Sequence, residues 1–119
     1  MKKTLVFGAS LNPVRYSNLA IRRLVDSGVE TVAYGLREGE VSGVSISNNF
    51  DKIKDIHTIS LYLNPKRQEE YFNEIISLAP SRVIFNPGTE NPTFYNLLEK
   101  NGIEVAVACT LVLLSTGQY

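Results

Sequence analysis

One polar turn near the start of the chain has the residue types and spacing for binding an anion. The segment GASLNPVRYS at residues 8–17 opens with a glycine, which lets the backbone approach a ligand closely. Amide groups at the start of a following helix, together with the Arg15 guanidinium, would bind a phosphate. The residues of this turn that we expect to contact a ligand are Gly8, Ala9, Ser10, Asn12, Arg15, Tyr16 and Ser17.

The turn needs a strand before it and a helix after it to hold these groups in place. The apolar run at residues 4–7 is typical of a parallel strand that is buried on both faces. Pro13 and Ser17 have the stop and capping chemistry of a helix start, and residues 18–25 have helical spacing. A strand-to-helix connection that binds nothing would explain the glycine, but not the crowding of polar side chains around it.

Asn-Pro pairs recur along the chain and give a second set of candidate binding residues. Each pair fixes a turn and presents a side-chain amide and a free carbonyl, which suit a nucleotide or an extended amide chain. A single pair is most simply a plain turn. Several of these pairs, however, follow expected strands at one edge of the expected sheet. The pairs are Asn12-Pro13, Asn64-Pro65, Asn86-Pro87 and Asn91-Pro92.

Strand patterns alternate with helix patterns along the rest of the chain. Further strands are expected at residues 30–35, 44–47, 58–63, 82–85 and 103–108. Helices are expected at residues 48–53, at 66–78 and from Pro92 onward, with a loop at 36–43 and an apolar segment at 111–114. This order predicts an α/β fold in one domain over residues 1–119, with an open, doubly wound parallel sheet of five or six strands and helices on both faces.

Composition excludes several classes of partner. The 119 residues include 12 basic and 12 acidic side chains, so no overall field favours nucleic acid or an anionic membrane. The single cysteine, Cys109, rules out an internal disulfide and is compatible with a reducing compartment. No leader pattern or membrane-spanning run is found, so we expect a cytoplasmic protein. The sequence leaves open whether it forms a homo-oligomer or binds a protein partner.

The same motifs resemble small stand-alone CoA-binding proteins, which are related to the nucleotide-binding N-terminal domain of the succinyl-CoA synthetase α subunit. The resemblance spans nearly the whole chain, and its NPGTENP motif is specific rather than compositional. The motifs that carry it are GASLNPVRYS at 8–17, GEVSGV at 39–44, LYLNPKRQ at 61–68, RVIFNPGTENP at 82–92 and ACTLVLL at 108–114.

The resemblance implies a Rossmann-like domain that binds coenzyme A or an acyl-CoA without forming a bond to it. It assigns the CoA phosphates to the turn at residues 8–17 and a basic or backbone contact to Arg37, in the loop after the second strand. Asn64 and Pro65 would flank the adenine, and Asn86 and Gly88 would face the pantetheine arm. It supports binding of a small nucleotide ligand and does not support catalysis.

The same residues fit two other functions less well than they fit CoA binding. A nicotinamide-dependent oxidoreductase needs more glycines in the first turn and an acidic residue after the second strand, where this chain has Arg37. Arg37 suits the 2′-phosphate of NADP as well as the 3′-phosphate of CoA, so an NADP-binding module remains the alternative. A hydrolase using Cys109 needs a nearby base, and His57 precedes a strand at the opposite edge of the sheet. A small buried thiol is therefore favoured at Cys109.

Overall fold

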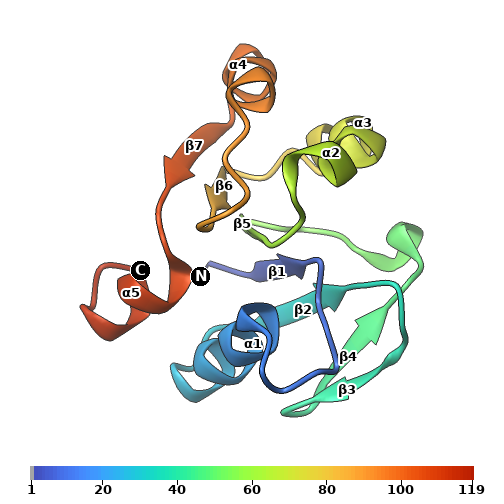
Figure 1. The fold of residues 1–119 in the computed structure, drawn as a ribbon, viewed down its shortest axis with the longest axis vertical. Coiled ribbons are helices and arrows are strands. Elements are labelled where there is room, and N and C mark those ends of the chain that lie inside the picture. Colours follow the sequence, from blue (N-terminus) through green and yellow to red (C-terminus); the bar gives the residue numbers. More distant parts are fainter. Residues whose placement is uncertain (1) are drawn as a thin grey trace.

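Seven strands form a single sheet that has helices on both faces in the computed structural model, which describes residues 2–119 (Figure 1). The strands are β1 Thr4–Phe7, β2 Thr31–Tyr34, β3 Gly39–Val41, β4 Val44–Ser47, β5 Thr58–Leu61, β6 Arg82–Phe85 and β7 Glu104–Val107. The helices are α1 Tyr16–Asp26, α2 Pro65–Gln68, α3 Phe72–Ser77, α4 Pro92–Lys100 and α5 Thr110–Ser115, with 3-10 turns η1 Phe50–Lys52 and η2 Glu69–Tyr71.

The order of the strands is β3-β4-β2-β1-β5-β6-β7, which confirms the doubly wound α/β fold. All neighbouring pairs are parallel except β3 with β4. The chain winds outward in one direction from β1 to β2 and β4, and in the other from β5 to β7. The strand order therefore reverses between β1 and β5, and in such sheets ligands bind at this switch point, beyond the carboxyl ends of the strands.

The sequence predicted a loop at residues 36–43, and this prediction is wrong for part of the segment. Residues 39–41 form the short antiparallel strand β3. Its partner β4 follows after only two residues, Ser42 and Gly43, whose φ angles are 50° and 81°. Two consecutive positive φ angles are the geometry of the tightest hairpin turn, and they let the chain pair with itself immediately. The six parallel strands match the expected strands, and β3 is an additional edge strand.

Both faces of the sheet are buried, which explains why β1 is continuously apolar. Successive side chains of a strand point to opposite faces. Leu5 and Phe7 pack in a core that includes residues of α3 and α4, whereas Val6 packs in a second core with α1. All four residues of β1 are fully buried between the two helix layers.

Two helix starts differ from the expectation. Helix α1 begins at Tyr16 with Arg15 at its N-cap, and Ser17 is buried inside the first turn, so Ser17 does not cap the helix. The helix expected over residues 66–78 is divided into α2, η2 and α3. The first piece, α2, is capped at its start by the Asn64 side chain, which accepts a hydrogen bond from the Arg67 amide at 2.9 Å. Within the described residues, the helices are all too short or too polar to cross a membrane.

Candidate functional site

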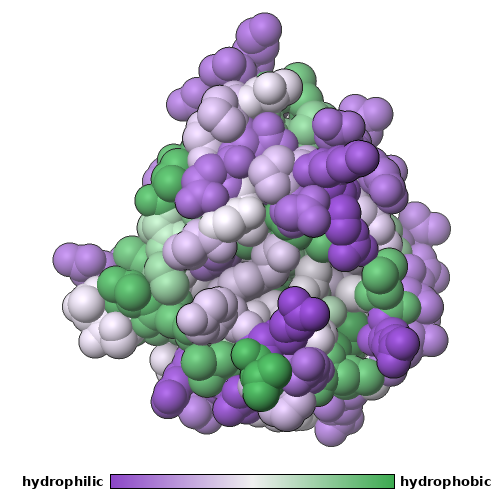
Figure 2. Space-filling view, in the orientation of Figure 1, coloured by the Kyte–Doolittle hydropathy of each residue, from purple (hydrophilic) through white to green (hydrophobic). Residues whose placement is uncertain are grey.

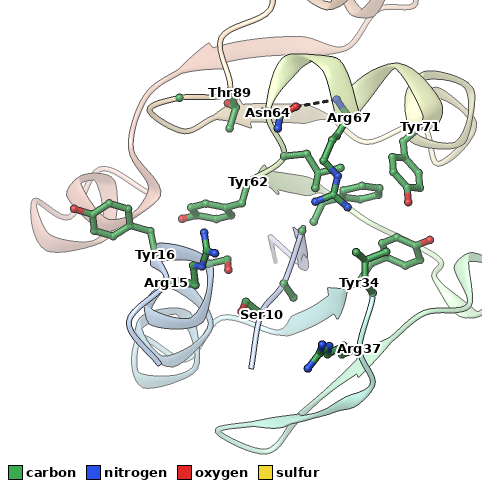
Figure 3. Close-up of a pocket in the computed structure, with 18 of the residues that line it drawn as sticks. Ser10, Arg15, Tyr16, Tyr34, Arg37, Tyr62, Asn64, Arg67, Tyr71 and Thr89 are labelled. Carbon is green, nitrogen blue, oxygen red and sulfur yellow. Dashed lines mark hydrogen bonds between the residues drawn. The ribbon is translucent and has the colours of Figure 1, made fainter. Parts of the chain in front are cut away.

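An open cavity of about 550 Å³ lies at the switch point, beyond the carboxyl ends of β1, β2 and β5 (Figure 3). Its size falls within the usual range of sites for small ligands. The lining comes from residues 7–11, 15–17, 34–37, 62–64 and 87–89, with Arg67 and Tyr71. The structure therefore brings together the turn at residues 8–17, the loop after β2 and the loop after β5.

Gly8 lets the first turn leave β1 in a conformation that other residues rarely adopt. Its φ angle is 92°, and an added Cβ atom would lie 3.1 Å from the Leu63 side chain and 3.3 Å from the Tyr62 carbonyl carbon. The amides of Gly8 and Ala9 both donate to the Tyr34 carbonyl, at 3.0 and 2.9 Å. These hydrogen bonds fix the turn against the end of β2. Gly8 and Ala9 thus shape the floor of the cavity, with their amides already paired.

The amides best placed to bind an anion are those at the start of α1. Tyr16 and Ser17 occupy the first two helical positions, whose amides have no acceptor within the helix. Both residues line the cavity, as does the N-cap residue Arg15. The positive end of an 11-residue helix therefore faces the cavity beside a guanidinium group.

Two residues of α1 that the sequence reasoning missed hold the turn in place. Asn18 is buried and donates to the Ser10 carbonyl at 2.9 Å. Arg22 donates to the Asn18 side-chain oxygen at 3.0 Å and to the Pro13 carbonyl at 3.0 Å. Because the two residues are four positions apart, they lie on one face of the helix. This spacing is the signal that sequence reasoning could have used.

Three arginines from three separate elements surround the cavity. Arg15 caps α1, Arg37 follows β2, and Arg67 extends from α2 toward the opening, as Figure 3 shows. None of the described lining residues is Asp or Glu. Arg67 was not among the expected site residues, although it stands in the same NPKRQ segment as Asn64. The site is therefore locally cationic in a chain whose net charge is +0.

The remaining expected residues divide into those that line the cavity and those that do not. Asn64 and Gly88 line it, whereas Pro65 starts α2 next to it. Asn12 is exposed outside the lining, and its side chain accepts from the Val14 amide at 3.1 Å.

Asn86 is placed beneath this edge of the sheet rather than in the cavity. It is 1% exposed, and its side-chain amide donates to Ser60 Oγ at 3.1 Å and to the Leu61 carbonyl at 2.9 Å. Its side-chain oxygen accepts from the Thr110 amide at 2.8 Å. Asn86 thereby joins β5, β6 and the start of α5. Its polar atoms are used within the protein, so it supports this edge instead of facing a pantetheine arm.

Tyrosines form much of the remaining cavity wall, which the sequence reasoning also missed. Tyr34 packs against Phe7 and Tyr71 with ring centroids 5.0 and 5.8 Å away. Burial raises the pKa of Tyr34 above its ordinary value of 10.0 and raises the pKa of Tyr62 to about 12. These side chains are therefore neutral at pH 7, and they do not offset the charge of the arginines.

The two residues considered for catalysis lie outside the cavity. Cys109 is half-buried at the N-cap of α5, so the expectation of a fully buried thiol is only partly met. His57 precedes β5 at the opposite edge, where its Nδ1 atom lies 2.7 Å from Thr58 Oγ1. Burial, together with the nearby Arg82 charge, lowers the pKa of His57. In residues 2–119, no cluster of His, Cys, Asp or Glu side chains is arranged to hold a metal ion.

Solved structures share this fold over nearly the whole chain. A crystal structure described as that of an uncharacterized protein is 47% identical, with a TM-score of 0.96, and the match covers 100% of this chain and 98% of that chain. A conserved hypothetical protein from Pyrococcus furiosus is 26% identical, with a TM-score of 0.78 and coverage of 89% and 92%. A protein from Thermus thermophilus, at 21% identity, a TM-score of 0.88 and coverage of 99% and 90%, shows the fold alone.

A search of curated proteins finds no match. A family model described as a CoA binding domain matches residues 2–115, which is nearly the whole chain. This match includes every residue that lines the cavity. It also confirms the family that the motifs at residues 8–17 and 82–92 indicated. The chain therefore belongs to the CoA binding domain family.

Proposed function

We propose that this protein binds coenzyme A, free or as an acyl thioester, without forming a bond to it. The observation that carries the proposal is the ring of Arg15, Arg37 and Arg67 around a cavity whose described lining has no carboxylate. CoA carries a diphosphate and a separate 3′-phosphate, so it presents anionic groups at two places along one molecule. Guanidinium groups from separate elements suit such a ligand better than a single anion-binding turn would.

The arrangement favours one direction for the ligand. The diphosphate would contact the first amides of α1, next to Arg15 and Ser10. Arg37 and Arg67 would bind the 3′-phosphate, with the adenine near Asn64. The pantetheine arm would then leave past Gly88, toward the side of the sheet where β6 and β7 lie.

We infer that the protein binds its ligand without catalysing a reaction. The described lining contains no His, Cys, Asp or Glu that would serve as a general base. Tyr34 and Tyr62 keep their protons at neutral pH, because their ordinary pKa of 10.0 already lies above it and burial raises the pKa further. The residues that the cavity offers are hydrogen-bond donors and cations, which bind and orient an anionic ligand.

Native mass spectrometry of the purified protein, followed by calorimetric titration, tests the proposal. We expect a copurified CoA species, and tighter binding of CoA than of NADP or NAD. A ligand at 100 times its dissociation constant stabilises the fold by about 2.7 kcal/mol, so thermal shifts at matched concentrations would rank the three. A larger shift with NADP than with CoA would overturn the assignment.

Arg67 gives a matched pair of variants for the same titration. Arg67→Ala removes a guanidinium that lines the cavity, whereas Lys66→Ala removes a neighbouring exposed cation that does not line it. We expect Arg67→Ala to weaken CoA binding by roughly one to two powers of ten. Equal losses in both variants would mean that only the general charge of α2 matters, which would remove Arg67 from the site.

A further inference from the structure

A second cavity, of about 570 Å³, lies in the groove between α1 and α5 on one face of the sheet. Its apolar lining is Leu19 from α1 and Leu111, Val112 and Leu114 from α5. Arg23, Asp26, Ser27 and Ser115 give it a polar margin. None of these residues lines the arginine-rich cavity between Arg15, Arg37 and Arg67.

One side of α1 carries residues that line both cavities. Tyr16 lines the first cavity and Leu19 lines the second, and residues three apart lie on the same side of a helix. Arg23 continues this row one turn further along. Tyr16 is 72% exposed, and Figure 3 shows it extending from α1 on the side of α5.

The direction of the two helices places the groove entrance at the ligand edge of the sheet. Helix α1 follows β1 and helix α5 follows β7, and both strands run in the same direction. Both helices therefore begin at the carboxyl edge, where the first cavity lies (Figure 1). Leu19 and Leu111 stand near these starts, whereas Asp26 and Ser115 stand near the far ends.

Helix α5 leaves apolar surface uncovered at this groove. Of its six residues, only Thr110 is buried, although four consecutive residues are Leu or Val. Val112 is 54% exposed. Figure 2 shows hydrophobic surface on the side of the molecule where α5 lies. A short helix with this composition would normally be buried, so its exposed side suits an apolar partner.

The geometry points to this groove as the binding site for the acyl chain of an acyl-CoA. The inference rests on the proposed function, because it needs the pantetheine arm to leave the first cavity past Gly88. The thioester would then pass Tyr16 at the start of α1, and a linear alkyl chain would lie between Leu19 and Leu111. The arginine-rich cavity binds the nucleotide, and the groove selects acyl-CoA over free CoA.

Calorimetric titration with CoA and with acetyl-, butanoyl- and hexanoyl-CoA tests this inference on the intact protein. Complete burial of a methylene group is worth up to about fourfold in affinity, and half of that free energy about twofold. Because this groove is open, we expect about twofold for each of the four added methylene groups, so hexanoyl-CoA should bind about 16-fold more tightly than acetyl-CoA. If affinity did not depend on acyl chain length, the inference that this groove binds the acyl chain would be wrong, whereas the proposal of CoA binding would stand. Loss of binding to every ligand would instead refute the proposed function.

Two exposed valines give a matched pair of variants. Val112 lies in the groove and is 54% exposed, whereas Val107 lies in β7 outside both cavities and is 58% exposed. Neither substitution by Gln opens a buried space, so both proteins should fold. We expect Val112→Gln to reduce the preference for hexanoyl-CoA severalfold, with unchanged affinity for CoA, and Val107→Gln to leave both unchanged.

A second copy of the chain is the competing occupant of the groove. Sedimentation analysis of the wild type and of Val112→Gln, without ligand, distinguishes the two. A monomer that gains affinity with acyl length supports the inference. A dimer that Val112→Gln dissociates, with no dependence on acyl length, would overturn it.

Discussion

At the scale of single residues, the candidate site is built from charge and backbone shape. Arg15 stands at the N-cap of α1, where its guanidinium and the first helical amides face the same cavity. None of the described lining residues is Asp or Glu, and the lining residues Tyr34 and Tyr62 are uncharged at neutral pH. No described lining group therefore offsets the charge of Arg15. The binding energy for an anion should therefore be concentrated in a few side chains.

The Arg15→Ala variant tests whether a single side chain supplies a large share of the binding energy. A hydrogen bond to a charged group contributes about 1.5 to 3 kcal/mol, so CoA affinity should fall by roughly one to two powers of ten. Calorimetric titration measures the loss, and urea unfolding should show little change because Arg15 is exposed. If the two proteins bound CoA equally, Arg15 would not belong to the site.

Gly35 determines how closely the end of β2 approaches the first turn. A Cβ atom at Gly35 would lie 2.4 Å from the Ala9 carbonyl oxygen, a backbone atom, whereas one at Gly39 would meet only the flexible Leu11 side chain, at 2.6 Å. We expect Gly35→Ala to cost about 1 to 3 kcal/mol of unfolding free energy and to weaken CoA binding. The matched variant Gly39→Ala should cost less, because Leu11 is 41% exposed and can move aside. Urea unfolding of both variants gives the comparison, and equal costs would contradict the close approach of Gly35 to the backbone.

At the scale of elements, one buried polar network joins the start of α5 to the sheet. Asn86 connects the Leu61 carbonyl, Ser60 Oγ and the Thr110 amide, and Ser60 Oγ lies 2.7 Å from Thr110 Oγ1. Thr110 is the one buried residue of α5. The position of this helix, and of the groove beside α1, therefore depends on these hydrogen bonds together with the packing of Leu114 against the core beside α1.

The Asn86→Ala variant should release this attachment. It removes three buried hydrogen bonds and deprives the Thr110 amide and the Leu61 carbonyl of the Asn86 side chain, whereas Ser60 Oγ keeps Thr110 Oγ1 as a partner, so the expected loss of unfolding free energy is about 3 kcal/mol. Asn101→Ala is the matched control, because Asn101 makes one exposed hydrogen bond, to the Leu97 carbonyl at 2.8 Å. It should cost less than about 1 kcal/mol. Hydrogen exchange would show the loss of protection first in α5, and uniform loss across the sheet would contradict this local role of Asn86.

At the scale of the whole molecule, stability at alkaline pH should depend on Tyr62. Its hydroxyl is buried near Ser60 and Thr110, and burial raises its pKa to about 12 from 10.0. Below pH 10 the folded and unfolded chains both keep this proton. Between pH 10 and 12 only the unfolded chain loses it, so the free energy of unfolding should fall by up to about 3 kcal/mol.

The comparison with Tyr62→Phe isolates this contribution from the other tyrosines. The variant removes the buried hydroxyl, so this position can no longer ionise. Its free energy of unfolding should therefore fall less steeply between pH 10 and 12. Urea titrations across this range measure the effect. Parallel pH curves for the two proteins would show that Tyr62 ionises equally in the folded and unfolded states.

Local patterns in the sequence determined the elements and their class. The apolar run at residues 4–7, the Pro92 helix start and the alternation of strands and helices predicted a doubly wound fold with five or six parallel strands, and the structure has six. The family resemblance followed from contiguous motifs, which the family match over residues 2–115 confirms. These features depend on neighbouring residues, so they can be read along the chain.

Only the tertiary structure decided which side chains share a cavity and which support it. Arg67 and the tyrosines Tyr34, Tyr62 and Tyr71 come from separate segments with no shared local signal, because strand order brings them together. The buried hydrogen bonds of Asn86 likewise join residues 24 to 26 positions apart. A sequence pattern shows that a residue is polar, whereas the packing around it determines whether that polarity faces a ligand or another part of the protein.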